Sequence, residues 1–500
     1  MEPIEQHEAD EEREQREQHG SKIEKGHLNQ SESSSMRLKV EQAVLEGVRT
    51  GEWKEGERVP SVRVMAERLG VHRLTVLKAY NRLEQAGLLE AKYRSGYFVR
   101  SRDSGKGDSE LGHEEHWAYA ARPGYRNRSR LSDIHRMPVK YRMSEALLDP
   151  ALLPNRFLAS HAKEVLDQHP MVLSTYSTVM GDLSLREAMA EYFQDRYGIE
   201  VNADEIMVTS GSSQAIDLVS RALMKPGDKV MVERPTYSPA IDIFQQQGIR
   251  MLPVELTPEG FDMERVEVLM RLEKPRMFYL NPTFHNPTGY TVPIHQRKAL
   301  IELAERYSCI LIEDDVYYDL YFDNPPPPPM FYYDTEGFVV YIRSYSKYIA
   351  PGLRISFLLA RPSVMEAIFP LKALSDAGTP LLGQKIFHSF FFSARMQEHI
   401  VKLRLAVRLR KEAMERVLAR SGWQWESPDG GLNLWVRLPE GVSAELLLAR
   451  GLDQSVAFVP GSICDPNGEM DNWIRLSYSL LGEKSLEEGV ERLISAADYV

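Results

Sequence analysis

The chain has 500 residues, of which 43% are hydrophobic, and it carries a formal net charge of −11. A chain of this length predicts more than one domain, and the negative charge argues against a protein that coats nucleic acid indiscriminately. No apolar run of about 18 residues occurs, so no membrane span is expected, and the first residues lack the build of a signal peptide. Cys309 and Cys464 match no metal spacing, so we expect neither a metal site nor a disulfide framework, and a reducing cytoplasm fits best.

Composition divides the first hundred residues into two parts. Residues 1–35 are rich in Glu, Gln and Ser and nearly devoid of large apolar side chains, which predicts a disordered acidic tail. Residues 36–100 hold 13 lysines and arginines against 8 aspartates and glutamates. A locally basic segment inside an acidic chain is typical of a specific DNA-binding module.

The basic segment has the pattern of three helices followed by a hairpin. Apolar residues recur at helical spacing and each helical stretch ends at a glycine, while two short apolar runs flank a turn at Gly96. This order predicts a winged helix-turn-helix domain. The expected helices cover residues 38–48, 60–70 and 72–87, and the expected strands cover residues 88–90 and 97–99.

The remaining chain is predicted to be a linker at 101–140 and an α/β domain at 141–500. The linker contains glycines, serines and arginines without apolar periodicity. In the α/β segment, short apolar runs alternate with helical stretches, which indicates a mainly parallel sheet. Ligands on such sheets bind at the carboxyl ends of the strands. The clearest predicted strands are 206–208, 229–232, 277–280, 310–312 and 338–341.

Several small and polar residues follow these strands and suit a phosphate group. Gly211-Ser212-Ser213 stands between a strand and a helix, where backbone N–H groups are open to an anion. Arg354 follows Pro351-Gly352 and can bind a phosphate through two N–H groups. Ser344 and Ser346 add hydroxyl groups. Each of these features is common by itself, so only their combination is informative.

Other polar residues suit an aromatic ring that carries an aldehyde. Asp314 ends a strand, where its carboxylate can pair with a protonated pyridine nitrogen. Tyr317 and Asn286 can donate hydrogen bonds to a phenolic oxygen of the same ring. Lys347 can form a Schiff base with the aldehyde. A capping aspartate, a turn asparagine or an exposed loop lysine explains each residue alone, but the set predicts a pyridoxal 5'-phosphate site.

Residues 141–500 resemble the fold-type I pyridoxal-phosphate aminotransferases, in which a small C-terminal α/β subdomain accompanies the main sheet. The resemblance implies that Lys347 binds the cofactor covalently, that Asp314 holds the pyridine nitrogen, and that Arg475 binds a substrate carboxylate. It implies a homodimer in which Tyr176 reaches the partner's phosphate. Ser356 departs from the family pattern, where glycine is common. The remaining implied cofactor contacts are the phenolic oxygen (Asn286, Tyr317), the ring face (Tyr237) and the phosphate (Ser212, Ser213, Ser344, Ser346, Arg354).

Residues 36–100 resemble GntR-type winged helix domains. His72 and Leu74 depart from the small hydroxyl residues that are frequent at their positions, which affects an expected phosphate contact. Arg73 stands at the start of the third predicted helix, where side chains meet bases or phosphates. By resemblance, the residues that approach double-stranded operator DNA are Arg63, Arg73, Thr75 and, in the wing, Arg94 and Gly96.

A GntR-type module joined to an aminotransferase-like domain is similar in architecture to the MocR-type regulators. One hypothesis is a transcription regulator whose larger domain senses an amino acid, a related amine or a vitamin B6 compound. A second is an active aminotransferase that carries a DNA-binding domain, because Lys347, Asp314 and Arg475 are all present. A third, in which the larger domain is a scaffold without cofactor, is disfavoured by the complete residue set.

Overall fold

The computed structural model describes residues 129–497 and, with short gaps, residues 36–99. The chain divides into two compact units, Met1–Pro123 and Gly124–Val500. The predicted tail at 1–35 and most of the predicted linker lie outside the described residues. No helix in the described part of the chain is long and apolar enough to cross a bilayer.

The N-terminal unit has the predicted winged helix-turn-helix order. Helical residues between 39 and 50 precede two helices and a hairpin whose strands pair antiparallel. The Ser61 hydroxyl accepts from the Val64 N–H at the start of the first of these helices, and Gly70 ends it in the left-handed conformation. The core contains Val40, Met65 and Tyr80. The elements are α2 (Val62–Leu69), α3 (Arg73–Gln85), β1 (Leu89–Lys92) and β2 (Gly96–Val99).

The second unit is built on an eight-stranded sheet with the strand order β4-β11-β10-β9-β8-β5-β6-β7. The strands β10, β9, β8, β5 and β6 run parallel to one another. By contrast, β11 pairs antiparallel with β10 and β4, and β7 pairs antiparallel with β6. The five predicted strands are all present. The strands are β4 (Ile206–Thr209), β5 (Lys229–Arg234), β6 (Arg250–Thr257), β7 (Gly260–Phe261), β8 (Met277–Leu280), β9 (Ile310–Asp315), β10 (Val339–Ser344) and β11 (Ser356–Leu359).

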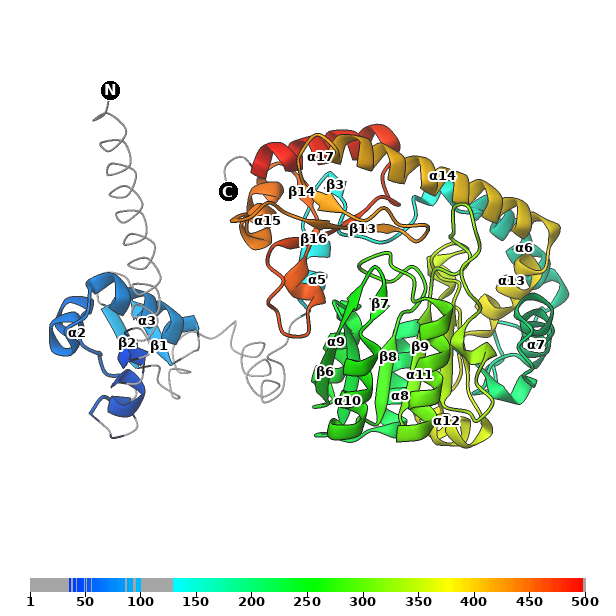
Figure 1. Cartoon of the computed structure of the whole chain (residues 1–500), viewed down its shortest axis with the longest axis horizontal. Coiled ribbons are helices and arrows are strands. Elements are labelled where there is room, and N and C mark those ends of the chain that lie inside the picture. The colour runs from blue at the N-terminus through cyan, green and yellow to red at the C-terminus, as the bar shows by residue number, and fades with distance from the viewer. Residues whose placement is uncertain are drawn as a thin grey trace, which may run out of the picture. The chain divides into compact units, whose positions relative to one another are not determined.

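Helices cover both faces of this sheet (Figure 1). Consecutive residues of β5 show the alternation, because Val230 and Val232 pack in one core cluster while Met231 packs in the other. Burial on both faces explains why the strands are apolar throughout. The helices are α6 (Asn155–Gln168), α7 (Leu183–Tyr197), α8 (Ser212–Leu223), α9 (Ser238–Gln246), α10 (Met263–Glu273), α11 (Ile294–Tyr307), α12 (Pro362–Asp376) and α13 (Leu381–Phe391), with the 3-10 turns η1 (Pro150–Leu152), η2 (Ala203–Glu205), η3 (Met330–Tyr332) and η4 (Pro351–Leu353).

The long helix α14 (Ala394–Leu418) leads from the sheet to a C-terminal subdomain, which contains a four-stranded antiparallel sheet in the order β12-β13-β16-β15. Its strands are β12 (Gln424–Trp425), β13 (Asn433–Arg437), β15 (Val459–Pro460) and β16 (Trp473–Ser477), and its helices are α15 (Ala444–Asp453), α16 (Gly461–Cys464) and α17 (Glu483–Ala497).

Packed structure begins earlier than the predicted boundary at 141. Residues 130–135, which we expected in the linker, form the short helix α5 (Arg130–His135). Leu131 packs against Trp435, Val459 and Cys464 of the C-terminal subdomain. The next strand, β3 (Tyr141–Arg142), pairs parallel with β14 (Val456–Ala457) of the same subdomain. The short helix escaped detection because six residues contain too little apolar periodicity to be distinguished from a loop.

Candidate functional site

Several of the predicted cofactor residues lie at the carboxyl ends of the strands β4, β9 and β10. Asp314 lies near the end of β9 and pairs in register with Ile342 of β10. Ser344 ends β10, and Gly211 follows β4. Parallel strands end at the same edge of a sheet, so these side chains share the position at which α/β folds bind ligands. Among the described residues, no cluster of His, Cys, Asp or Glu is arranged to hold a metal ion.

The Asp314 carboxyl group is buried and only partly hydrogen-bonded. The Tyr279 hydroxyl donates to its Oδ2 atom over 2.8 Å, while Oδ1 has no hydrogen-bond partner among the described residues. Burial raises the pKa of Asp314 to about 7, and the Tyr279 hydrogen bond opposes that rise. A cationic N–H group placed at Oδ1 would satisfy this acceptor and stabilise the carboxylate.

Asn281 connects Asp314 to the predicted Asn286 loop. Its side-chain amide donates to the Asp314 backbone carbonyl, and its Oδ1 atom accepts from the Asn286 N–H over 2.7 Å. The Glu233 carboxylate accepts from the Asn281 backbone N–H, and its Oε2 atom lies 3.1 Å from His285 Nε2. This buried network fixes two of the predicted site residues relative to each other.

Lys347 lies in the turn between β10 and η4 and is partly buried. Burial, together with the positive charges of Arg475 and Arg354, lowers the pKa of its amine to about 8. At pH 7 roughly a tenth of such an amine is neutral, whereas an ordinary lysine is almost entirely charged. The pKa shift therefore increases the fraction of Lys347 that can act as a nucleophile.

Gly211 and Arg354 lie close together at the start of α8. Gly211 has φ +98°, and a Cβ atom there would lie 2.4 Å from Arg354 Nη2, so only glycine permits this close approach. Arg354 is exposed and donates to the Ser210 carbonyl over 2.9 Å. Ser212 and Ser213 occupy the first turn of α8, where backbone N–H groups have no partner within the helix.

The other two predicted phosphate residues are hydrogen-bonded within the turn itself. Ser346 donates through its hydroxyl to the Ile355 carbonyl over 3.3 Å, and its backbone N–H donates to the Ser344 hydroxyl over 3.4 Å. Ser356, the departure from the family pattern, is buried and its hydroxyl has no partner among the described residues. It lies in β11 rather than in the turn.

Arg475 reaches the same site from the C-terminal subdomain. Its Nη1 atom donates to Asn286 Oδ1 over 3.1 Å, and Nη2 donates to the Ser144 carbonyl. Nε has no partner among the described residues. The His135 ring also lies 3.2 Å from the Ser144 carbonyl. A carboxylate that binds the Arg475 guanidinium would therefore compete with the Ser144 contact.

The three predicted tyrosines differ in environment. Tyr317 is buried, and burial raises its pKa above the ordinary value. The pKa of Tyr237 is also raised, first by burial and then by the negative charge of Asp314, which places its ring near that carboxylate. Tyr176 is 88% exposed, so within one chain it does not join the other residues.

In the N-terminal unit, the predicted DNA-contacting residues lie on the surface. Arg73 is the first residue of α3 and is exposed, whereas Thr75 is half-buried. Arg63 is exposed on α2 and lies 3.3 Å from Glu67. Gly96 begins β2 with φ +97° and lies against Arg58, which was not predicted. Arg94 lies outside the described residues.

Sequence reasoning missed Tyr279, Asn281 and Asn433 in the cofactor site. Both amide atoms of the Asn433 side chain are buried and lack partners among the described residues. Tyr279 lies inside an apolar strand and was interpreted as core, although a hydroxyl group near the carboxyl end of a central strand is a usable signal. Asn281 follows the same strand directly, so its position alone could have identified it.

Comparisons with known proteins identify the class to which this architecture belongs. Residues 154–493 match the family of aminotransferases of class I and II, and residues 36–99 match the bacterial regulatory proteins of the gntR family. The chain therefore belongs to the aminotransferase class I and II family and joins that domain to a gntR-type DNA-binding module.

Relatives with helix-turn-helix names match along most of the chain. YdfD of Bacillus subtilis, an uncharacterized HTH-type transcriptional regulator, is 30% identical over 90% of this chain and 94% of its own length. TauR of Rhodobacter capsulatus, also an HTH-type transcriptional regulator, is 28% identical over 92% of this chain and 96% of its own length. The chain is a MocR-type regulator of this architecture, as the motifs predicted.

The larger domain also matches enzymes. The 2-aminoadipate transaminase of Thermus thermophilus is 36% identical over 69% of this chain and 86% of its own length. A similar solved structure is LysN, an α-aminoadipate aminotransferase from the same species, complexed with N-(5'-phosphopyridoxyl)-L-leucine. It superposes on this chain with a TM-score of 0.71 and is 33% identical in sequence, and the match covers 77% of this chain and 98% of LysN. The family is dependent on pyridoxal 5'-phosphate, which is the cofactor of this domain.

The residues of the site fit this cofactor. The unpartnered Oδ1 atom of Asp314 matches a protonated pyridine nitrogen, and the neutral fraction of Lys347 matches an aldehyde. The start of α8, with Gly211 against Arg354, matches a phosphate dianion. The three groups differ in chemistry, and each corresponds to a different part of one molecule.

Proposed function

We propose that this regulator senses an amino acid, a related amine or a vitamin B6 compound at the Lys347 site and changes the DNA binding of its gntR-type module in response. The observation that carries the proposal is the buried, half-satisfied Asp314 carboxylate beside an amine of lowered pKa, in a chain that also has a basic DNA-binding module. A structural scaffold gains nothing from a buried acceptor without a partner, because such a group destabilises the fold.

Each site residue then has a role. Lys347 would supply the amine for the cofactor aldehyde. Asp314 would hold the pyridine nitrogen, and Asn286 with Tyr317 would hold the phenolic oxygen. Pyridoxal phosphate supplies an electron-withdrawing ring that acidifies the carbon next to a bound amino group. Tyr237 would pack against the ring, and the residues that would hold the phosphate are Ser212, Ser213, Ser344, Ser346 and Arg354.

Arg475 gives the site its selectivity for carboxylates. Its guanidinium can donate two hydrogen bonds to a carboxylate once the Ser144 carbonyl is released. An amino acid presents both an amine to Lys347 and a carboxylate to Arg475, whereas a simple amine presents only the first. We therefore expect an amino acid to bind more tightly, as an effector, than the amine with the same side chain.

The proposal includes a cytoplasmic homodimer that binds double-stranded operator DNA. Tyr176 is exposed in the single chain and would reach the phosphate of the partner subunit. In the DNA-binding module, Arg63, Arg73, Thr75, Arg94 and Gly96 would approach the duplex, with Arg73 at the N-terminal end of the recognition helix. Coupling between effector and DNA requires that the effector bind two conformations of the protein with different affinities.

A working aminotransferase remains the second candidate. The lowered pKa of Lys347 and the presence of Arg475 favour it, because both serve turnover as well as sensing. The two candidates differ in whether a second, keto-acid substrate restores the starting state rapidly.

The test begins with the visible absorbance of the purified full-length protein. Lys347→Ala should remove the absorbance of the bound cofactor, while Lys225→Ala, at an exposed lysine of the same unit, should not. Amino acids are then screened for spectral changes and for altered binding to DNA fragments that the protein selects from a random pool. Rapid multiple turnover with amino-acid and keto-acid pairs, together with unchanged DNA binding, would contradict the regulator proposal and favour an active aminotransferase.

A further inference from the structure

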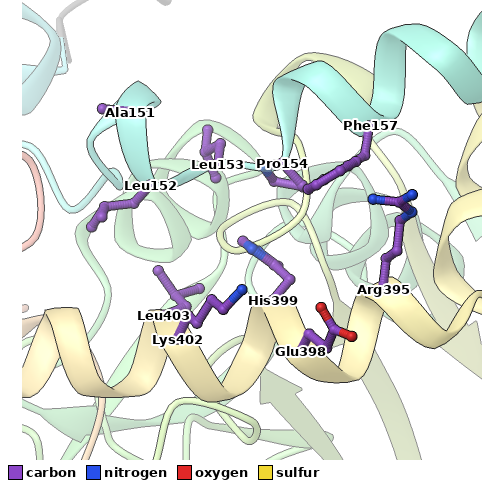
Figure 2. Close-up of a pocket in the computed structure, with 10 residues that line it drawn as sticks. All are labelled: Ala151, Leu152, Leu153, Pro154, Phe157, Arg395, Glu398, His399, Lys402 and Leu403. Atoms are coloured by element: carbon purple, nitrogen blue, oxygen red, sulfur yellow. The ribbon is translucent and has the colours of Figure 1, made fainter.

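A second cavity lies between α14 and the segment formed by η1 and the start of α6 (Figure 2). Its volume is about 270 Å³, which is room for a ligand of roughly ten non-hydrogen atoms. None of the residues proposed to hold the cofactor lines it. The wall contributed by η1 and α6 is apolar and consists of Leu152, Leu153, Pro154 and Phe157.

The opposite wall, from α14, carries charge. Arg395, His399 and Lys402 follow one another at helical spacing and project toward the apolar wall (Figure 2). The Arg395 guanidinium lies 4.4 Å from the Phe157 ring centroid, and this contact holds it at the edge of the cavity. Arg395 and Lys402 are both exposed, and no ion pair in the described part of the chain involves either of them.

The balance of charge around the cavity is positive. Burial lowers the pKa of His399, so its ring is neutral at pH 7. Glu398 is the single acidic residue among those that line the cavity. The exposed side chains Arg395, Glu398 and Lys402 therefore give the α14 wall a net charge of +1, and an apolar surface lies opposite them. Ligand pockets combine mostly apolar walls with a few placed polar groups in this way.

We propose that this cavity is a second binding site, for a small carboxylate with an apolar body. The body would pack on Leu152, Leu153 and Phe157, and the carboxylate would lie between Arg395 and Lys402. An amine of the same shape would meet two positive charges, and a neutral amide would lose the charge pairing. The ligand class thus differs from the amino acids proposed for the Lys347 site, which present an amino group as well as a carboxylate.

The cavity is connected to the Lys347 turn by hydrogen bonds from α14. His399 lies in the cavity wall, and its Nε2 atom lies 2.6 Å from the backbone carbonyl of Tyr348, the residue after Lys347. Arg404 donates to the Asp319 carbonyl over 2.6 Å, and the Tyr348 hydroxyl donates to the Asp319 carboxylate over 2.7 Å. Helix α14 thus contacts the turn directly at Tyr348 and indirectly through Asp319, so a ligand that displaces His399 would shift the residue next to Lys347.

Such coupling is reciprocal. If the carboxylate changes the affinity for the cofactor or effector, the cofactor or effector must change the affinity for the carboxylate by the same factor. This coupling rests on the proposed function of Lys347, whereas occupation of the cavity does not.

The binding test uses 3-phenylpropionate as the probe and 3-phenylpropanamide as its neutral control, in calorimetric titrations of the full-length protein. We expect the amide to bind more weakly. We expect Lys402→Glu to weaken binding of the acid by roughly fivefold or more and Ala151→Trp to block it by filling the cavity. Arg416→Glu is the matched control, because it reverses an exposed charge of α14 about 21 Å along the helix, and it should leave binding unchanged.

Two further variants separate this site from the cofactor site. Lys347→Ala should still bind the probe, so that loss of the cofactor does not count against the cavity. His399→Phe should retain binding while the probe no longer changes the visible absorbance of the bound cofactor. Equal affinity for acid and amide, or binding that Arg475→Lys abolishes and Lys402→Glu leaves intact, would overturn the proposal.

Discussion

The hydrogen bond from Tyr279 to Asp314 makes a quantitative prediction about cofactor affinity. Tyr279→Phe removes only the hydroxyl that donates to Asp314 Oδ2 over 2.8 Å. This bond lowers the pKa of Asp314, which burial raises to about 7. A hydrogen bond to a charged group contributes about 1.5–3 kcal/mol, which corresponds to about one to two units of pKa. In the variant the pKa of Asp314 should therefore lie about one to two units higher.

The consequence for binding depends on pH, because a protonated pyridine nitrogen requires an ionised Asp314. At pH 6 the ionised fraction should fall about ten- to hundredfold, and at pH 8 about two- to tenfold. The dissociation constant of pyridoxal phosphate should rise by the same factors. Titration of cofactor-free protein with the cofactor, followed by visible absorbance between pH 6 and pH 9, measures both.

Tyr341→Phe is the matched control. Tyr341 is equally buried and donates over 2.8 Å to Oδ2 of Asp315, the next residue of β9. Asp315 faces Arg343 rather than the cofactor site. This variant should lose stability without losing cofactor affinity. The reasoning fails if Tyr279→Phe binds the cofactor like the wild-type protein at pH 6, or if both variants weaken binding equally.

Three other outcomes are expected. In cofactor-free protein, Asp314 binds its proton more tightly in the folded than in the unfolded state. The stability of the wild type should therefore fall relative to that of Asp314→Asn as pH rises from about 4 to about 7. Denaturant unfolding should show that this difference in stability changes by about 4 kcal/mol over that range, and a pH-independent difference would contradict the pKa assignment. Gly211→Ala should displace Arg354 and weaken binding of pyridoxal phosphate while sparing pyridoxal, which has no phosphate; equal losses would argue against a phosphate site. Arg73→Ala should weaken operator binding about ten- to hundredfold and leave the cofactor absorbance unchanged; loss of both would show that the two units do not function separately.

The sequence predicted the strands and the order of the site residues because these depend on local patterns. Continuous apolar runs such as Met277–Leu280 are buried on both faces of the sheet, so neighbouring helices do not obscure their signal. Asp314 could be placed at a strand end for the same reason. The register that aligns it with Ile342, and the choice of Oδ1 as the free acceptor, depend on contacts far apart in the chain.

Residues that act through other residues were harder to find. Asn281 and Tyr279 serve the site by holding Asp314 in place, and a single sequence carries no pattern for such contacts. The contact between His399 and Tyr348 joins residues 51 positions apart and depends on how α14 crosses the domain. Arg475 was predicted from its motif, but its hydrogen bond to the Ser144 carbonyl was not, because backbone acceptors have no signature in a sequence.

Helix α5 and strand β3, at the start of the described part of the larger unit, are both attached to one subdomain. Both elements, the first described ones after residue 128, are anchored on the C-terminal subdomain through Leu131 and the pairing of Tyr141 with Val456. Arg475 lies in that subdomain and holds the Ser144 carbonyl, two residues beyond β3. A movement of the C-terminal subdomain relative to the eight-stranded sheet would therefore carry α5 and β3 with it.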